Sequence, residues 1–470
     1  LDAGEVSAAE LHQIAFNAIE TLNPTLNFFT SSSSEEADRA LSQLDPLAPF
    51  AGIPILLKEG VGLAGQPASM SSRLGEGLQC KAASELVRRL KRTGVVMLGY
   101  TNAPEFGTSS STESVLHGPA RNPWNIEHST GGSSGGASAA VAAGVVPIAQ
   151  SSDGGGSIRI PAHCCGVFGL APTRGRTPVG PGSYGGIFGI VRQHVTTRSV
   201  RDSAAMLDQL HGAEPGALHR VGRPQCSFLE EVGTDPGRLR IAFSATSPSA
   251  RPVHPDCVAA VKKAAKLCAD LGHDVEETAP IYDWELFVQA SFDHNSFMVM
   301  SAIEKMEQAT GRRAGPDTLE ACNVAILKRA RSLRLSDFNA SLMQLHAISR
   351  DIEQFFDDWD ILITPVCLSP APPLGKINGN AAGLTDRIWF DQVHSNFAAF
   401  TPVFNITGNP SMSVPLCESA DGLPIGIQCT ARIGDEATLF RLAAQFEQAC
   451  PWIGRRPQIG LFQSIESKCP

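Results

Sequence analysis

The sequence predicts a large α/β fold, and three observations lead to that prediction. Short apolar runs bounded by Gly or by charged residues are typical of buried strands, and they alternate with amphipathic helical patterns. The alternation continues along all 470 residues without an internal repeat or a long linker. The composition, 43% hydrophobic and 18% charged, excludes a disordered chain or a coiled coil. We therefore expect one domain over residues 1–470, with a mostly buried sheet covered by helices.

The predicted elements follow in order along the chain. A first helix begins at the capping box of Ser7 and Glu10 and is expected to end at Asn23-Pro24. Apolar runs predict buried strands at 53–57, 95–98, 239–243, 361–363, 412–414 and 425–429. Helical spacing predicts further helices at 84–90, 137–143, 257–271 and 439–446.

The segment 280–345 has a different character from the alternating parts. Bulky apolar residues such as Phe292 and Met298 stand there among charge-rich stretches. We expect a helical insertion that covers a substrate site. A basic cluster within it is interpreted as a solvated helix face rather than a nucleic-acid patch. Its members are Lys328, Arg329, Arg331 and Arg334.

The net charge and the cysteines indicate which partners and which cellular compartment to expect. The formal net charge is −9, which argues against nucleic acid or an anionic membrane as the main partner. The twelve cysteines are scattered and form no Cys-x-x-Cys motif, so we expect free thiols in a reducing cytoplasm. The longest apolar stretch is too short to cross a bilayer, and no signal peptide is visible. The sequence leaves a homodimer open.

Two Gly/Ser-rich loops carry the most unusual composition. They occupy 129–137 and 150–161, and one helix and one strand separate them. Gly lacks a Cβ and allows backbone N–H groups to approach a ligand closely. A Ser beside such a loop can act as a nucleophile whose oxyanion the N–H groups stabilise. Because apolar segments flank both loops, a flexible linker is disfavoured.

Other motifs in this chain do not have the context that their chemistry needs. The stretch 131–135 matches the Gly-x-Ser-x-Gly nucleophile elbow, but the residues before it are turn-like rather than a strand. The stretch 180–185 matches a dinucleotide loop but follows no clear strand. No Walker loop, His-Glu-x-x-His motif or close His/Cys metal cluster is present, and His163 beside Cys164 and Cys165 is interpreted as packing rather than ligation. We therefore expect neither a metal nor another cofactor.

Lys58 is the candidate base for such a serine. It ends the predicted strand 53–57, where an apolar run leads into a charge. Partial desolvation there would lower its pKa and leave part of it neutral. The local pattern fits equally well a strand-end lysine that pairs with Glu59 at the surface.

Several stretches together resemble the amidase signature family. They are 52–58, 100–107, 118–125, 131–136, 153–159, 166–176 and 421–426. The resemblance runs nearly end to end, and its serine-rich block is highly specific. It implies an α/β/α sandwich around a large mixed sheet and a Ser–cis-Ser–Lys triad.

The resemblance also implies a role for individual residues. Ser157 matches the nucleophile, Ser133 the bridging cis serine and Lys58 the base. Backbone N–H groups of Gly154, Gly155, Gly156 and Ser157 would form the oxyanion hole. Asp153 and Arg159 are expected to pair or to hold the loop backbone. Ser134 is expected to cap the following helix and to support the triad.

Among the subgroups, the pattern is most similar to bacterial aryl-acyl amidases, urethanases and nylon-oligomer cyclic-dimer hydrolases. This implies a neutral, apolar amide or carbamate substrate that passes through an acyl-enzyme. The expected pocket residues are Met70, Gly131, Gly132, Tyr184, Ile187 and Phe188. Three alternatives are a tRNA-dependent amidotransferase subunit, a non-catalytic binding or scaffold homologue, and a Ser–His–Asp esterase on another fold. Ile160 argues against the first, because that subunit typically has Gln there.

Overall fold

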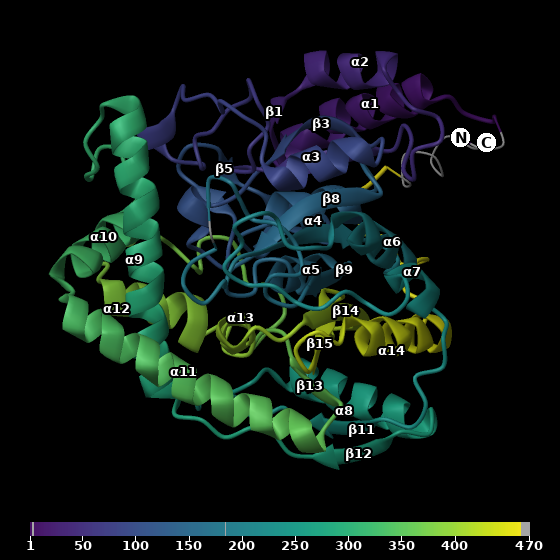
Figure 1. Cartoon of the computed structure of the whole chain (residues 1–470), viewed down its shortest axis with the longest axis vertical. Coiled ribbons are helices and arrows are strands. Elements are labelled where there is room, and N and C mark those ends of the chain that lie inside the picture. Colours follow the sequence, from purple (N-terminus) through teal and green to yellow (C-terminus); the bar gives the residue numbers. More distant parts are fainter. Residues whose placement is uncertain (2–3, 184, 462–470) are drawn as a thin grey trace.

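A single mixed sheet of eleven strands crosses the molecule in the computed structural model, which describes residues 1, 4–183 and 185–461 (Figure 1). From one edge to the other, the order is β1 (Phe29–Ser32), β3 (Val96–Thr101), β2 (Pro54–Lys58), β8 (Ile148–Asp153), β10 (Arg192–Thr197), β9 (Phe168–Ala171), β14 (Ser411–Glu418), β15 (Pro424–Ala431), β13 (Ile361–Pro365), β11 (Arg240–Phe243) and β12 (Asp274–Glu277). The prediction of an α/β fold around a large mixed sheet is confirmed.

The strand directions determine where Lys58 and the second Gly/Ser-rich loop emerge. β2 is parallel to both of its neighbours, β3 and β8. The carboxyl ends of parallel strands meet at one edge of a sheet, so Lys58 and Asp153 leave the sheet on the same side. β10 then runs antiparallel to β8, and its residue Gln193 stands opposite Ser152.

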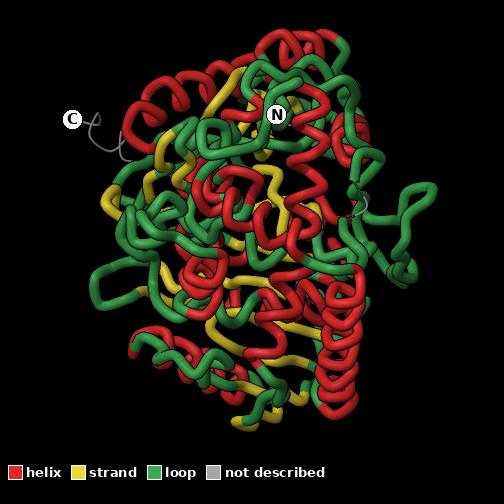
Figure 2. Tube along the Cα trace, turned by 90° about the vertical axis from the view of Figure 1, so that its left-hand side faces the viewer, coloured by secondary structure: helices red, strands yellow, loops and turns green. Residues whose placement is uncertain are grey.

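Helices cover both faces of the sheet, and Figure 2 shows the strands passing between them. In β2, Leu56 packs into one apolar cluster and its neighbours Ile55 and Leu57 pack into another. Both faces of this strand are therefore buried, as its continuous apolar run predicts.

The helices are α1 (Ala8–Leu26), α2 (Ser34–Ser42), α3 (Glu85–Arg92), α4 (Gly135–Ala142), α5 (Arg159–Cys165), α6 (Val200–Leu210), α7 (Phe228–Glu231), α8 (Pro255–Asp270), α9 (Trp284–Thr310), α10 (Ala321–Ser332), α11 (Leu335–Asp358), α12 (Asp386–Phe390), α13 (Pro402–Thr407) and α14 (Glu436–Ala449). Short 3₁₀ turns lie at Arg73–Gly75 and Glu105–Gly107, and a π-helical turn lies at Asp391–Ser395. Two small ribbons pair β4 (Glu113–Ser114) with β5 (Gly118–Pro119) and β6 (Arg121–Asn122) with β7 (Asn125–Ser129).

The first helix is longer than its sequence indicates. The capping box of Ser7 and Glu10 is present, but α1 continues through Pro24 to Leu26. Pro24 has no N–H and cannot donate a hydrogen bond within the helix. Leu26 is fully buried, and its packing in the apolar core compensates for this missing bond. The helix ends at Asn27, whose left-handed backbone lets its N–H bond the carbonyl of Asn23 at 2.8 Å.

The segment 280–345 is helical and contains α9, α10 and the first part of α11. These helices form one group at the left of Figure 1, and α9 packs against both of the others. The basic cluster on them is not wholly a solvated face. Arg329 is partly buried and bonds Asp293 at 2.6 Å and Asp386 at 3.2 Å. It therefore joins α10 to α9 and α12.

Three strands of the sheet lack the apolar signal of a strand. β10 reads Arg-Gln-His-Val-Thr-Thr, yet it lies inside the sheet between β8 and β9. β1 and β12 form the two edges and are short and polar.

The cysteines of the described part are free, and most are buried. Over that same part, no helix combines the length and the apolarity that crossing a membrane requires.

Candidate active site

Lys58 lies inside the protein at the carboxyl end of β2. Its side chain is only 5% exposed. The Nζ atom donates to Ser133 Oγ at 2.7 Å and to Ser152 Oγ at 3.0 Å. Glu59 bonds Ser69 instead, at 2.6 Å. The alternative of a surface lysine paired with Glu59 is therefore wrong.

Burial controls the charge of Lys58. Loss of hydration favours the neutral amine and lowers its pKa from 10.5 to about 7, while the negative charge of Asp153 acts in the opposite direction. At neutral pH a large fraction of the amine is therefore unprotonated. Such an amine can accept a proton from the hydroxyl group that it contacts.

Ser133 and Ser134 begin the turn into α4. The Gly132–Ser133 peptide bond is cis, and Ser133 is 2% exposed. Ser134 precedes α4, but its side chain caps no N–H of that helix, contrary to expectation. Its hydroxyl donates instead to the carbonyl of Ser152 at 3.1 Å, and its N–H donates to the carbonyl of Ser157 at 3.2 Å. Ser134 thus joins the two Gly/Ser loops.

The side chain of Asp153 holds the loop 154–157 in place. This carboxylate accepts hydrogen bonds from the N–H groups of Gly156 at 2.7 Å and of Ile158 at 3.1 Å. Gly156 therefore cannot offer its N–H to a substrate, which corrects the expected oxyanion hole. Among the described residues, the N–H groups of Gly154, Gly155 and Ser157 have no acceptor. The free donors of this loop are these three.

A buried ion pair holds Asp153 in turn. Arg159 contacts it with two nitrogen atoms, each at 3.0 Å, and neither side chain is exposed. Burial alone would raise the pKa of Asp153, but the Arg159 charge and hydrogen bonds from Arg159 and Asn405 outweigh it and lower that pKa. The carboxylate is therefore ionised and can anchor the loop permanently.

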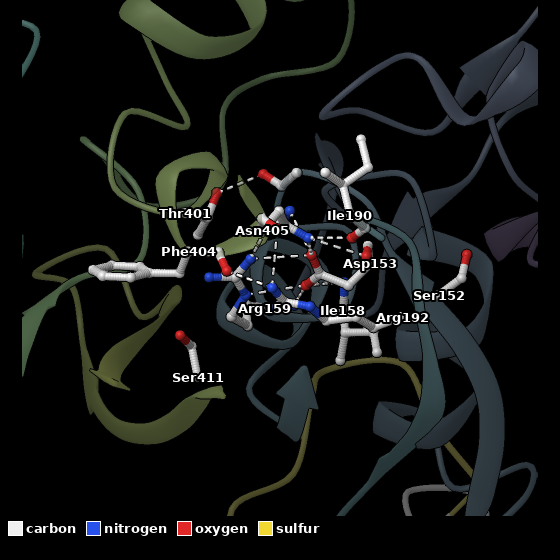
Figure 3. A network of polar contacts seen from close by, with 12 residues as sticks. Ser152, Asp153, Ile158, Arg159, Ile190, Arg192, Thr401, Phe404, Asn405 and Ser411 are labelled. Atoms are coloured by element: carbon white, nitrogen blue, oxygen red, sulfur yellow. Dashed lines mark hydrogen bonds and ion pairs between the residues drawn. The ribbon is translucent and has the colours of Figure 1, made fainter. Parts of the chain in front are cut away.

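The C-terminal part of the chain completes this network (Figure 3). Asn405 donates to the Asp153 carboxylate at 2.8 Å and to the Ile190 carbonyl at 3.0 Å. Thr401 donates to the carbonyl of Gly155 at 2.7 Å. Gln428 accepts from Arg159 at 2.8 Å. Sequence reasoning missed these residues because they lie far along the chain and have no distinctive local pattern.

Lys58, Ser133 and Ser157 all line one cavity of about 680 Å³. Its other walls are largely apolar and come mainly from α9, α12 and the loops beside the sheet. The apolar lining includes Val61, Phe106, Ile190, Phe292, Met298, Val299, Ile326, Trp389, Phe390 and Val393. Besides Lys58, the charged residues of the lining, within the described residues, are Glu59 and Lys305.

The structure separates the expected pocket residues into two groups. Met70 and Gly132 line the cavity. Gly131 does not, because it packs against Cys164 and the backbone of α5. Ile187 is 42% exposed at the surface, and Phe188 places its ring edge-on to His294, so neither belongs to the lining. Tyr184 lies outside the described residues.

A histidine-based site does not form here. Of the described residues, His394 is the one histidine of the lining, and no described group bonds its Nδ1 atom. Burial lowers its pKa to about 4. It makes no contact with Ser157 or Ser133 that could activate either hydroxyl. Across residues 4–183 and 185–461, no group of three His, Cys, Asp or Glu side chains could hold a metal.

Comparison with known proteins finds similar proteins over nearly the whole chain. A family model described as Amidase matches residues 10–440. The 6-aminohexanoate-cyclic-dimer hydrolase of Paenarthrobacter ureafaciens is 35% identical over 471 residues, covering 97% of this chain and 94% of that protein. The putative amidase AmiC of Mycobacterium tuberculosis is 35% identical, covering 96% and 93%. A solved structure of a 6-aminohexanoate cyclic dimer hydrolase superposes with a TM-score of 0.90 at 34% identity, covering 97% of this chain and 96% of the other.

Proposed function

Because this chain belongs to the amidase family and is an amidase, we propose that it cleaves neutral, largely apolar amides through a serine acyl-enzyme. Ser157 is the nucleophile, Ser133 the proton relay and Lys58 the base. The observation that carries this proposal is the 2.7 Å contact between Lys58 Nζ and Ser133 Oγ. The contact lies in the lining of an apolar cavity, where burial brings the pKa of Lys58 to about 7.

The proton path follows from this arrangement. Neutral Lys58 accepts the proton of Ser133, and Ser133 accepts the proton of Ser157 as the Ser157 oxygen attacks the carbonyl carbon. Negative charge then develops on the carbonyl oxygen, and the free N–H groups of Gly154, Gly155 and Ser157 stabilise it. An amine is a poor leaving group unless it is protonated. Ser133 returns a proton to the departing nitrogen, and a water molecule later releases the acid by the reverse path.

The lining supports the substrate class. Most of it is apolar, and it includes no Arg among the described residues to clamp a small carboxylate. A volume of about 680 Å³ accommodates a substrate with a sizeable apolar body. The relative named above acts on a cyclic dimer of 6-aminohexanoate, which supports linear and cyclic aliphatic amides alongside anilides. Carbamates are included because their carbonyl group and leaving amine are similar.

A substrate panel tests the proposal. Purified enzyme is given an anilide, an aliphatic amide, a primary amide, a carbamate and an ester of matched acyl size, together with glutamine and malonamate. We expect the apolar anilide and amide to have a higher kcat/KM than glutamine or malonamate. A strong preference for the small charged amides would overturn the substrate class. Absence of turnover on every compound would overturn the proposed function.

A further inference from the structure

Gln193 is a polar side chain in the cavity that the proposed mechanism does not use. It lies on β10, directly opposite Ser152 on β8. Directly opposed residues of antiparallel strands point to the same face of the sheet, so Gln193 and Ser152 are neighbours. Ser152 contacts the Lys58 amine at 3.0 Å. Gln193 is half-buried and lines the same cavity as Lys58 and Ser157.

Hydrogen bonds from the backbone fix which way the Gln193 amide faces. The main-chain N–H of Lys58 can only donate, and it bonds the side chain of Gln150 at 3.1 Å. Gln150 must therefore present its oxygen to Lys58. The NH₂ group of Gln150 is left to bond the side chain of Gln193 at 2.8 Å. Gln193 must consequently present its oxygen to Gln150, and its own NH₂ group faces elsewhere.

This NH₂ group is a donor without an acceptor. No described residue accepts a hydrogen bond from Gln193 Nε2. Gln150 is fully buried, so the chain that orients Gln193 is shielded from water. An oriented donor in a largely apolar cavity is the usual means of recognising one acceptor on a ligand.

We propose that Gln193 is a specificity-determining residue that donates a hydrogen bond to a second carbonyl-type oxygen of the substrate, beyond the scissile carbonyl. The inference rests on the proposed amide hydrolysis and deepens it. The preferred substrate is then a neutral molecule with two amide or carbamate groups joined by an apolar spacer. The scissile group reaches Ser157 while the second group bonds Gln193.

Three variants separate donation from a structural role. Gln193→Glu keeps an oxygen for Gln150 but has no hydrogen to donate. Gln193→Met has a similar size and loses both functions. Thr177→Val is the matched control, because the Thr177 hydroxyl accepts the backbone N–H of Gln193 at 3.3 Å and does not contact its amide. The negative charge of Gln193→Glu would shift the pKa of Lys58, so the readout is a ratio between two substrates.

The substrates are 4-nitroanilides of equal length. The reference has an all-methylene acyl chain. In each of the other compounds, one amide group replaces two adjacent chain atoms, at a different position in each compound. In a parallel series of aliphatic amides, the second amide group lies in the amine part of the molecule instead of the acyl part. We expect wild-type enzyme and Thr177→Val to prefer one amide-containing member over the reference in kcat/KM. Both Gln193 variants should lose roughly three- to tenfold of that preference, as expected for one neutral hydrogen bond.

The outcomes distinguish the two proposals. Equal kcat/KM for the reference and every amide-containing member would overturn the role of Gln193 and leave amide hydrolysis standing. A preference that is lost in Gln193→Met but retained in Gln193→Glu would show that only the oxygen of Gln193 matters, and would overturn donation. If wild-type enzyme cleaves none of the compounds, the proposed function fails and this inference fails with it.

Discussion

Lys58 Nζ and Ser133 Oγ are 2.7 Å apart at a point where both side chains are almost completely buried. The amine has a second hydroxyl neighbour, Ser152, and the Asp153 carboxylate acts on it electrostatically, without a hydrogen bond. With a pKa of about 7, this lysine is partly neutral at neutral pH and is not half of an ion pair. The predictions below follow from this arrangement and from the loop beside it.

The first prediction concerns the pH dependence of Lys58. A lysine in water has a pKa near 10.4, so only about one molecule in 2,500 is neutral at pH 7. In this site burial lowers the pKa to about 7. The base must be neutral to accept a proton, so kcat/KM for an anilide should rise between pH 6 and 8 and then level off. The measurement is a pH profile with a single-proton fit.

Variants of Lys58 provide the control for that profile. Lys58→Met should remove most of the amide turnover, and Lys58→Arg should not restore it because a guanidinium stays protonated. Ester hydrolysis should fall less, since an alkoxide leaves with less need for a proton. Near-normal amide turnover by Lys58→Met, with an unchanged pH profile, would place the base elsewhere.

The second prediction concerns the nucleophile. A sulfonyl fluoride or a slowly hydrolysed ester should leave a covalent adduct on Ser157, the proposed nucleophile beside the free N–H groups of the loop. Ser157→Ala should abolish both turnover and labelling while circular dichroism stays unchanged. Peptide mapping by mass spectrometry locates the adduct. An adduct on another serine that survives in Ser157→Ala would refute the assignment.

The third prediction contrasts two glycines of the loop. Gly156 has φ +125°, and a Cβ there would come within 2.2 Å of the Thr401 hydroxyl and 2.6 Å of Ile160. At Gly154, a Cβ would meet only Val191, at 3.7 Å. Gly156→Ala should therefore reduce kcat/KM by several orders of magnitude and lower the thermal midpoint, while Gly154→Ala should stay folded and active. Similar kinetics for the two variants would show that the loop is not held as described.

The fourth prediction concerns the buried ion pair. Asp153→Asn removes the charge that compensates Arg159 in a site without solvent exposure. Leaving one member of a buried pair uncompensated costs about 3–5 kcal/mol. Urea denaturation should show a loss of that order in the free energy of unfolding, together with loss of activity. Asp270→Asn is the comparison, because Asp270 pairs with Lys266 on the exposed surface of α8. A surface pair of this kind should make no measurable difference.

The sequence predicts the elements around Lys58 well, because an apolar run that ends in a lysine is a local signal. The two Gly/Ser loops are also visible locally, and the family resemblance assigns the residues in them. The use of Gly156 could not be foreseen, although Asp153 is only three residues away, because the carboxylate is oriented by Asn405, which lies 252 residues further along the chain. The strand β10 could not be predicted for a different reason. Its polar side chains make hydrogen bonds inside the protein, as Thr196 does with Ser151 and His194 with Ser203, so its burial leaves no apolar pattern in the sequence.

The exposed position of Ile187 could not be predicted from the sequence either. A bulky apolar residue in a Gly-rich loop is usually buried, and the local pattern does not reveal that this one points outward. The opposite case is Arg329, which stands in a basic run yet turns inward to Asp293 because two acidic residues from other helices converge on it.

The three side chains proposed to react lie between residues 58 and 157, whereas the groups that anchor the loop beside them, Thr401, Asn405 and Gln428, come from the last fifth of the chain. During synthesis on the ribosome, a nascent protein with every reactive residue already outside the exit tunnel would therefore still be inert. The loop of Asp153 and Arg159 becomes rigid only when the final strands insert into the middle of the sheet. The protein thus becomes able to catalyse its reaction only when the chain is complete, and a truncated chain released early from the ribosome would be inactive rather than partly active.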